Sequence, residues 1–126
     1  MTDSKTYAVR VLLRAGRDYD EALIRIAETE GEDAARRWDA AYIMALRSLA
    51  MYPRRYAVPP DAGGFPGEVR SVTFRRDLGT APYRLIYRVI EDSDDGPQVE
   101  VMHLRHAQAK PITRKEAREI EAQNRE

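Results

Sequence analysis

The sequence contains no cysteine, which excludes a disulfide framework, a thiolate nucleophile and cysteine ligands for a metal. Its only histidines are His103 and His106. Because residues three apart on a strand point to opposite faces, we do not expect them to share a metal ion. No Gly-rich phosphate loop or nucleophile signature is present, so no cofactor is expected. Basic and acidic residues number 21 each, so net charge alone does not indicate nucleic-acid binding.

Long apolar stretches are absent as well. No run of residues approaches membrane-spanning length, and no basic-then-apolar leader begins the chain. Together with the lack of cysteine, these absences favour a cytoplasmic protein that has no membrane partner. With 126 residues, 43% of them hydrophobic and 33% charged, the chain is predicted to form a single domain, residues 1–126, with its core within about residues 7–110.

The stretch from Pro82 to Glu91 carries the clearest pattern in the sequence. Read with a period of two residues, one side is wholly apolar and the other is apolar but carries two arginines. The first side consists of Tyr83, Leu85, Tyr87 and Val89, and the second of Arg84, Ile86, Arg88 and Ile90. We therefore predict an inner strand with the core on one side and a cationic surface on the other. The alternative interpretation is a strand whose arginines are simply solvated.

The first half of the chain predicts a strand followed by a helical hairpin. The alternation over Tyr7–Leu13 indicates an N-terminal strand. A capping box at Asp18–Glu21 opens the first helix, which ends at Gly31. A second helix starts near residue 32 or 33 and runs to Tyr52, where the next residue is a proline. This hairpin is predicted to pack on the sheet and to supply most of the stability.

The second half predicts the rest of an α+β fold. Strands over Glu68–Arg76 and Gln98–His106 flank the central strand, which gives a three-stranded antiparallel meander. The long irregular connection Pro53–Gly67 has the length of a functional or mobile loop. A second capping box opens a short C-terminal helix over 113–124, and its thin apolar content predicts weak docking.

Candidate chemistry is limited to the arginines of the strands, the tyrosines and one histidine. Arg70 and Arg84 could hold a phosphodiester and stabilise developing charge, but a guanidinium cannot act as a base. His106 is the candidate proton carrier, because its ordinary pKa of about 6.5 suits that role. The alternative is that these arginines form surface ion pairs with nearby glutamates and that His106 is an ordinary residue at a strand end.

Several segments, in order, resemble the RelE/ParE superfamily of type II toxin–antitoxin proteins, and within it the plasmid-stabilisation branch. The resemblance runs from about residue 7 to residue 113. It is carried by Ala34–Trp38, Ser48–Pro53 with Arg54 and Arg55, Glu68–Arg70, Tyr83–Val89, Val99–His106 and Lys110–Thr113. It implies a small α+β domain in which a helical hairpin cradles an antiparallel sheet. It also implies a cognate antitoxin that wraps the toxin, and it leaves a homodimer open.

Two activities occur among such relatives, and the resemblance is compatible with either of them. RelE-like members cut messenger RNA on the ribosome without a metal, through basic residues on the concave face of the sheet, whereas ParE-like members inhibit DNA gyrase without being nucleases. The first is our main expectation, with Arg70, Arg84 and His106 as catalytic residues. The alternatives are a gyrase inhibitor and an attenuated, non-toxic relative. Further substrate contacts are expected from Tyr87, Arg88, Arg105 and Lys110.

The ribonuclease expectation depends on one geometric condition. Arg70 and Arg84 must point from neighbouring strands into one open hollow. If they lie on opposite faces, or if each is neutralised by its own carboxylate, the condition fails. Two features of the sequence already favour the alternatives to a ribonuclease, which are a gyrase inhibitor and an attenuated relative. The chain has zero net charge, and Ala107–Lys110 follows the last strand where such relatives often have arginines.

Overall fold

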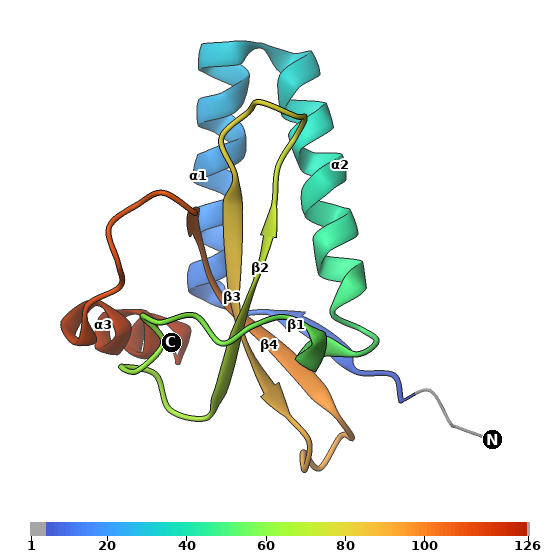
Figure 1. The fold of residues 1–126 in the computed structure, drawn as a ribbon, viewed down its shortest axis with the longest axis vertical. Helices are drawn as coiled ribbons and strands as arrows, with labels where there is room; N and C mark the ends of the chain where they lie inside the picture. The colour runs from blue at the N-terminus through green and yellow to red at the C-terminus, as the bar shows by residue number, and fades with distance from the viewer. Residues whose placement is uncertain (1–4, 126) are drawn as a thin grey trace.

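The computed structural model describes residues 5–125. Its elements follow one another as β1 (Ala8–Val11), α1 (Leu13–Glu30), α2 (Glu32–Ser48), a short 3-10 helix η1 (Pro53–Arg55), β2 (Glu68–Phe74), β3 (Tyr83–Ile90), β4 (Gln98–His106) and α3 (Arg114–Asn124). This is the α+β order expected from the sequence. Figure 1 shows α1 and α2 side by side as a hairpin, with α3 lying crosswise to them near the lower half of the sheet.

The four strands form one sheet in the order β1-β4-β3-β2. The meander is confirmed, because β2 pairs antiparallel with β3 and β3 pairs antiparallel with β4. β1, however, runs parallel to β4, with Val9 opposite Val99, so the expectation of an antiparallel sheet is wrong at this edge. Parallel neighbours require a long crossover, and here the hairpin and the meander together supply it.

The hairpin packs on one face of the sheet, which we call the hairpin face. Trp38 and Tyr42 of α2 contact Phe74 of β2, and Trp38 also meets Tyr83 of β3 edge-on, with ring centroids 5.2 Å apart. Leu85 and other fully buried side chains of the central strands complete this core. It forms because the apolar side of β3 and the helical stripe of α2 face each other. The prediction that the hairpin packs on the sheet is confirmed.

The opposite face, which we call the α3 face, has a smaller core of its own. Its buried members are Ala62, Phe65, Val69, Ile86, Met102, Ile112, Ala117 and Ile120. Both α3 residues in this set are completely buried, so the expectation of a weakly docked helix is wrong. The loop packs closely too, because a Cβ on Gly64 would lie 2.8 Å from the Ala117 Cβ. The connection between η1 and β2 therefore covers the sheet together with α3.

The helix boundaries differ from the sequence prediction at two points. α1 begins at Leu13, five residues before the expected cap, so Asp18 lies inside the helix. α2 ends at Ser48, and Tyr52 adopts a left-handed conformation with φ 53°. At α3 the cap is confirmed, because Thr113 Oγ1 accepts a hydrogen bond from the Glu116 backbone N–H at 3.0 Å.

Candidate functional site

The predicted site residues divide between the two faces of the sheet. Arg70 of β2 pairs with Tyr87 of β3, whereas Arg84 pairs with Thr73. Cross-strand partners share a face, and positions 84 and 87 of one strand face opposite ways. Arg70 and Tyr87 therefore lie on the hairpin face and Arg84 on the α3 face. The expectation that Arg70 and Arg84 point into one hollow is wrong.

Arg84 is held by a carboxylate from the loop before β2. Its Nη1 and Nη2 donate to the two oxygens of Asp61 at 2.9 and 2.5 Å. The side chains are only 12% and 10% exposed. The same carboxylate accepts the Ile112 backbone N–H at 2.8 Å. The Arg84 guanidinium, followed by the Ile112 N–H, lowers the pKa of Asp61 to about 2, so the pair stays charged near neutral pH.

Asp61 was missed by the sequence reasoning. It lies 23 residues before Arg84 in an irregular loop, where no periodicity marks which side chains return to the sheet. The length of the loop was the only signal that it does more than connect two elements. Its contacts show that it fastens the loop and the segment before α3 to the third strand.

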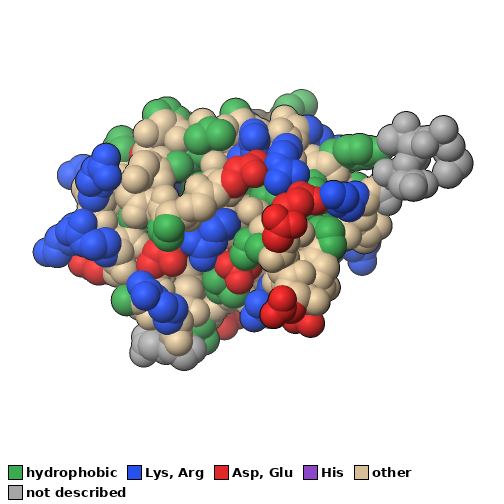
Figure 2. All heavy atoms as spheres, turned by 90° about the horizontal axis from the view of Figure 1, so that it is seen from below, with side chains coloured by type: hydrophobic (Ala, Val, Ile, Leu, Met, Phe, Trp, Pro, Cys, Tyr) green, Lys and Arg blue, Asp and Glu red, His purple; other side chains and the backbone are tan. Residues whose placement is uncertain are grey.

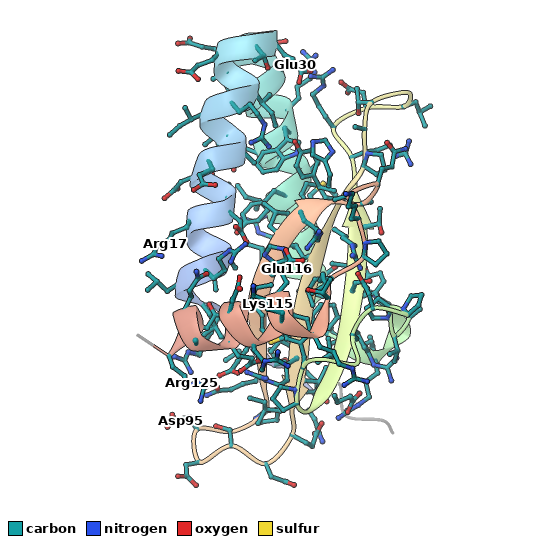
Figure 3. The ribbon with its side chains drawn as sticks, turned by 90° about the vertical axis from the view of Figure 1, so that its left-hand side faces the viewer. Arg17, Glu30, Asp95, Lys115, Glu116 and Arg125 are labelled. Atoms are coloured by element: carbon teal, nitrogen blue, oxygen red, sulfur yellow. The ribbon has the colours of Figure 1, made fainter. Side chains whose placement is uncertain are left out.

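The other two predicted site arginines on the α3 face, Arg88 and Arg105, are also paired. Arg88 contacts Glu100 of β4 at 3.1 Å and Glu121 of α3 at 2.6 Å. Arg105 contacts Glu116 of α3 at 2.9 Å. Figure 3 shows α3 crossing in front of the sheet with Glu116 on its upper side. These guanidinium groups thus join strands to the covering helix and present no open cationic surface.

The two remaining basic candidates differ in their surroundings: the Lys110 side chain is exposed, whereas the Arg70 side chain is hydrogen-bonded. The Lys110 side chain is exposed and bonds to no residue among 5–125. Its carbonyl oxygen accepts from Arg105 Nη2 at 2.7 Å. On the hairpin face, Arg70 donates to the Tyr56 carbonyl at 2.8 Å and to Glu68 at 3.1 Å. Arg70 therefore anchors the start of the loop.

Tyr87 has a similar structural role. Its side chain is completely buried, and its hydroxyl donates to the carbonyl oxygen of Pro53. Burial raises its pKa, which keeps the hydroxyl protonated. A group without access to solvent contacts no substrate in this conformation.

His106 lies apart from the three paired arginines. Its ring contacts the ring of Tyr83 on the hairpin face in a tilted arrangement, with centroids 4.2 Å apart. Burial and then the charge of Arg25 lower its pKa below the ordinary value, so the ring is neutral near pH 7. A proton carrier must lie within about 3 Å of the atom it serves. His106 and Arg84 therefore do not form one catalytic group in this structure.

The imidazole that does lie near an arginine of the α3 face is His103, which the sequence reasoning considered only as a metal ligand. Its Nδ1 lies 2.6 Å from Asp18 of α1, and its Nε2 lies 3.4 Å from Arg105 Nη1. Asp18 also accepts the backbone N–H of Leu104 at 3.1 Å. β1 pairs with β4 only as far as Val101, so this carboxylate satisfies the strand edge where β1 has ended. Burial of Asp18 acts to raise the pKa of its carboxyl group, but the hydrogen bonds that it accepts outweigh this effect, and the pKa is lowered.

Metal sites and membrane-spanning helices are both absent from the part of the chain that the structure describes. Within residues 5–125, no group of three or more histidine or acidic side chains is placed to hold a metal ion. Over the same range, no helix combines the length and the apolar character needed to cross a membrane.

Comparison with known proteins finds both a matching family and similar solved structures. The family model for the ParE toxin of the type II toxin–antitoxin system parDE matches residues 9–111. A solved structure described as the chromosomal ParDE TA system from P. aeruginosa is 17% identical, with a TM-score of 0.63. The alignment covers 83% of this chain and 100% of that chain. At this identity the structural match establishes similarity of fold. No curated protein matches the sequence significantly.

Proposed function

The chain belongs to the family of ParE toxins of type II toxin–antitoxin systems, and we propose that it acts by binding a protein target, DNA gyrase, and not by cutting messenger RNA. A cognate antitoxin is the partner that membership of the family implies. Plasmid stabilisation as its cellular role, residence in the cytoplasm and a homodimer remain predictions.

The observation that carries this proposal is the pairing of Arg84 with Asp61. A ribonuclease site would need this guanidinium to be available for a phosphodiester. Both of its Nη atoms are occupied by one carboxylate in a nearly buried pair. Breaking a buried pair by withdrawing one partner costs roughly 3–5 kcal/mol. Binding of a phosphate by Arg84 would therefore have to offset this loss of free energy.

The distribution of charge supports the same proposal. RNA binding depends on several basic side chains that neutralise neighbouring phosphates. The chain has zero net charge, and basic and acidic side chains are interspersed on the face seen in Figure 2. Mixed charge of this kind suits a protein partner better than a polyanion.

The direct test uses the purified chain with purified DNA gyrase and relaxed plasmid. We expect loss of ATP-dependent supercoiling as the protein is added, because the bound toxin blocks the enzyme. In parallel, transcript length is followed in a translation reaction that contains EDTA, and we expect intact messenger RNA. Arg84→Lys serves as a matched variant, since it keeps one positive charge but loses the bidentate geometry.

Transcript cleavage by the wild type, abolished in folded Arg84→Lys and in His106→Ala, would overturn the proposal and restore the ribonuclease. Normal supercoiling at a large excess of the protein would also overturn it. A growth assay distinguishes a toxin from a non-toxic relative. Cells that express the chain without an antitoxin should stop growing if it is a gyrase inhibitor or a ribonuclease, and should grow normally if it is a non-toxic relative.

A further inference from the structure

A small cleft opens between α1 and the turn that joins β2 to β3. Its volume is about 140 Å³, and Arg25, Arg76, Trp38, Tyr83 and His106 are among the side chains that line it. It lies on the hairpin face, away from the arginines that α3 and the loop before β2 cover. Its walls combine two cations and the Glu30 carboxylate with aromatic surface.

Arg25 is the cation that distinguishes this cleft. Within residues 5–125 its guanidinium makes no ion pair, and the one hydrogen bond of its side chain is a long contact of 3.5 Å from Nη2 to the Tyr83 hydroxyl. Arg84, by contrast, is held by both oxygens of Asp61. An arginine has five donors in a planar fork, and most of those of Arg25 remain unused.

Trp38 adds a second, independent donor. Its side chain is 2% exposed, and its buried indole N–H has no hydrogen-bond partner in the part of the chain that the structure describes. Buried polar groups are nearly always satisfied. Trp38 is one of the residues that line the cleft, and residues 5–125 supply no acceptor for its indole N–H.

The other charged groups in the cleft leave a modest positive balance. Arg76 is paired with Glu30 at 2.8 Å and with Asp77 at 2.9 Å. His106 stays neutral near pH 7, because burial and Arg25 lower its pKa more than Glu30 raises it. One unpaired guanidinium facing an aromatic wall suits a single carboxylate. A chain of phosphates would meet the carboxylates of Glu30 and Asp77.

We propose that this cleft receives the carboxylate of an aspartate or glutamate from the protein that the toxin binds. The inference rests on the proposed function, because it names the contact through which the target is held. The adjoining turn offers an apolar contact beside the charge, since the Leu78 side chain is 97% exposed. Protein interfaces are enriched in arginine and combine apolar with polar contacts.

The single tryptophan allows the cleft to be tested without the target. In a ¹⁵N-labelled sample, the indole N–H of Trp38 gives one isolated NMR signal. We expect a saturable shift of that signal as sodium acetate is added at constant ionic strength. The shift should vanish in Arg25→Gln and persist in Arg17→Gln, because Arg17 is an exposed arginine elsewhere on α1 (Figure 3). Inorganic phosphate is titrated as the comparison anion.

The target is tested with the same variants. We expect Arg25→Gln to weaken binding to DNA gyrase roughly 10- to 100-fold, as for the loss of a charge-assisted hydrogen bond. Arg17→Gln should bind like the wild type, and circular dichroism checks that both variants are folded.

The outcomes separate the two proposals. An acetate shift that depends on Arg25, in a protein that does not bind gyrase, removes the proposed function and leaves the carboxylate site. No saturable shift, or an equal shift in Arg25→Gln, overturns the site even if gyrase is inhibited. A stronger response to phosphate than to acetate overturns the assignment of a carboxylate. Unchanged gyrase affinity in Arg25→Gln removes the cleft from the interface.

Discussion

The two faces of the sheet are stabilised in different ways. On the hairpin face, aromatic and aliphatic side chains such as Trp38, Leu85 and Tyr42 form one extended core. On the α3 face, a smaller core is crossed by Arg84, Arg88 and Arg105, each of which meets a carboxylate from α3 or from the loop before β2. One face derives its stability from burial of apolar area, and the other also depends on where charged side chains meet.

This difference changes how an arginine on a strand is interpreted. A guanidinium under a helix and a loop, within reach of a carboxylate, fixes the position of the covering segment. Ion pairs of this kind add little net stability compared with apolar side chains of similar size. They do oppose arrangements in which one charge is left unpaired. The arginines of the α3 face therefore help to specify where α3 and the loop lie.

The largest effect is expected from a change on the hairpin face. Trp38→Ala should lower the free energy of unfolding by about 3–5 kcal/mol, because it leaves a cavity among four aromatic rings. Urea denaturation followed by circular dichroism measures the loss. Trp38→Phe keeps most of the apolar volume and should lose clearly less. Equal losses in the two variants would mean that packing at Trp38 is not the main contribution.

On the α3 face, Asp61→Ala should cost about 3 kcal/mol, because it leaves Arg84 without its carboxylate in a nearly buried position. Adding Arg84→Met should restore much of this loss, since the double variant buries no unpaired charge. A double-mutant cycle in urea gives the coupling between the two sites. If the double variant is less stable than Asp61→Ala, the unpaired charge of Arg84 is not the cause of the stability lost in Asp61→Ala.

Most of the fold was predictable because its strongest signals are local. β4 has the expected bounds, and β3 differs from the predicted strand by one residue at each end, since alternation over eight or nine residues leaves few alternatives. The parallel pairing of β1 was not predictable, because strand direction depends on contacts between residues about ninety positions apart. The start of α1 was missed for a similar reason. Asp18 looked like a local cap, but besides Arg14 of its own helix its partners are His103 and Leu104 of β4.

The candidate site was much less predictable than the fold. The sequence identified arginines on strands, and register then placed Arg70 and Arg84 on opposite faces. Neither Asp61 nor Glu121 stood out as a partner, because carboxylates in a loop or a short helix carry no periodic signal that reaches a distant strand. Arg25 was overlooked on an exposed helix face, and only the cleft beside Trp38 gives it a role.

The pH dependence of stability gives a smaller effect that also distinguishes the faces. The pKa of Asp61 is about 2 in the folded protein and near 3.9 in an unfolded chain. The folded state therefore favours the carboxylate, and its contribution is complete above about pH 4 and is lost as the pH falls toward 2. We expect a loss of about 1–2 kcal/mol from this group after solvent screening. Urea midpoints between pH 5 and 2.5 should decline less steeply in Asp61→Asn. An identical decline would assign the acid sensitivity to other carboxylates.

The smallest expected effect asks whether α3 unfolds together with the sheet. Thr113→Ala removes the hydroxyl that accepts the Glu116 N–H and should cost about 1 kcal/mol, whereas Thr113→Ser should cost little. Because Ile120 is completely buried against the α3 face, we expect the cost to appear in global unfolding, so that protected amides of β3 exchange faster as well. Native-state hydrogen exchange measures both regions at once. Faster exchange confined to α3 would mean that this helix opens by itself, and the α3 face would then be covered only part of the time.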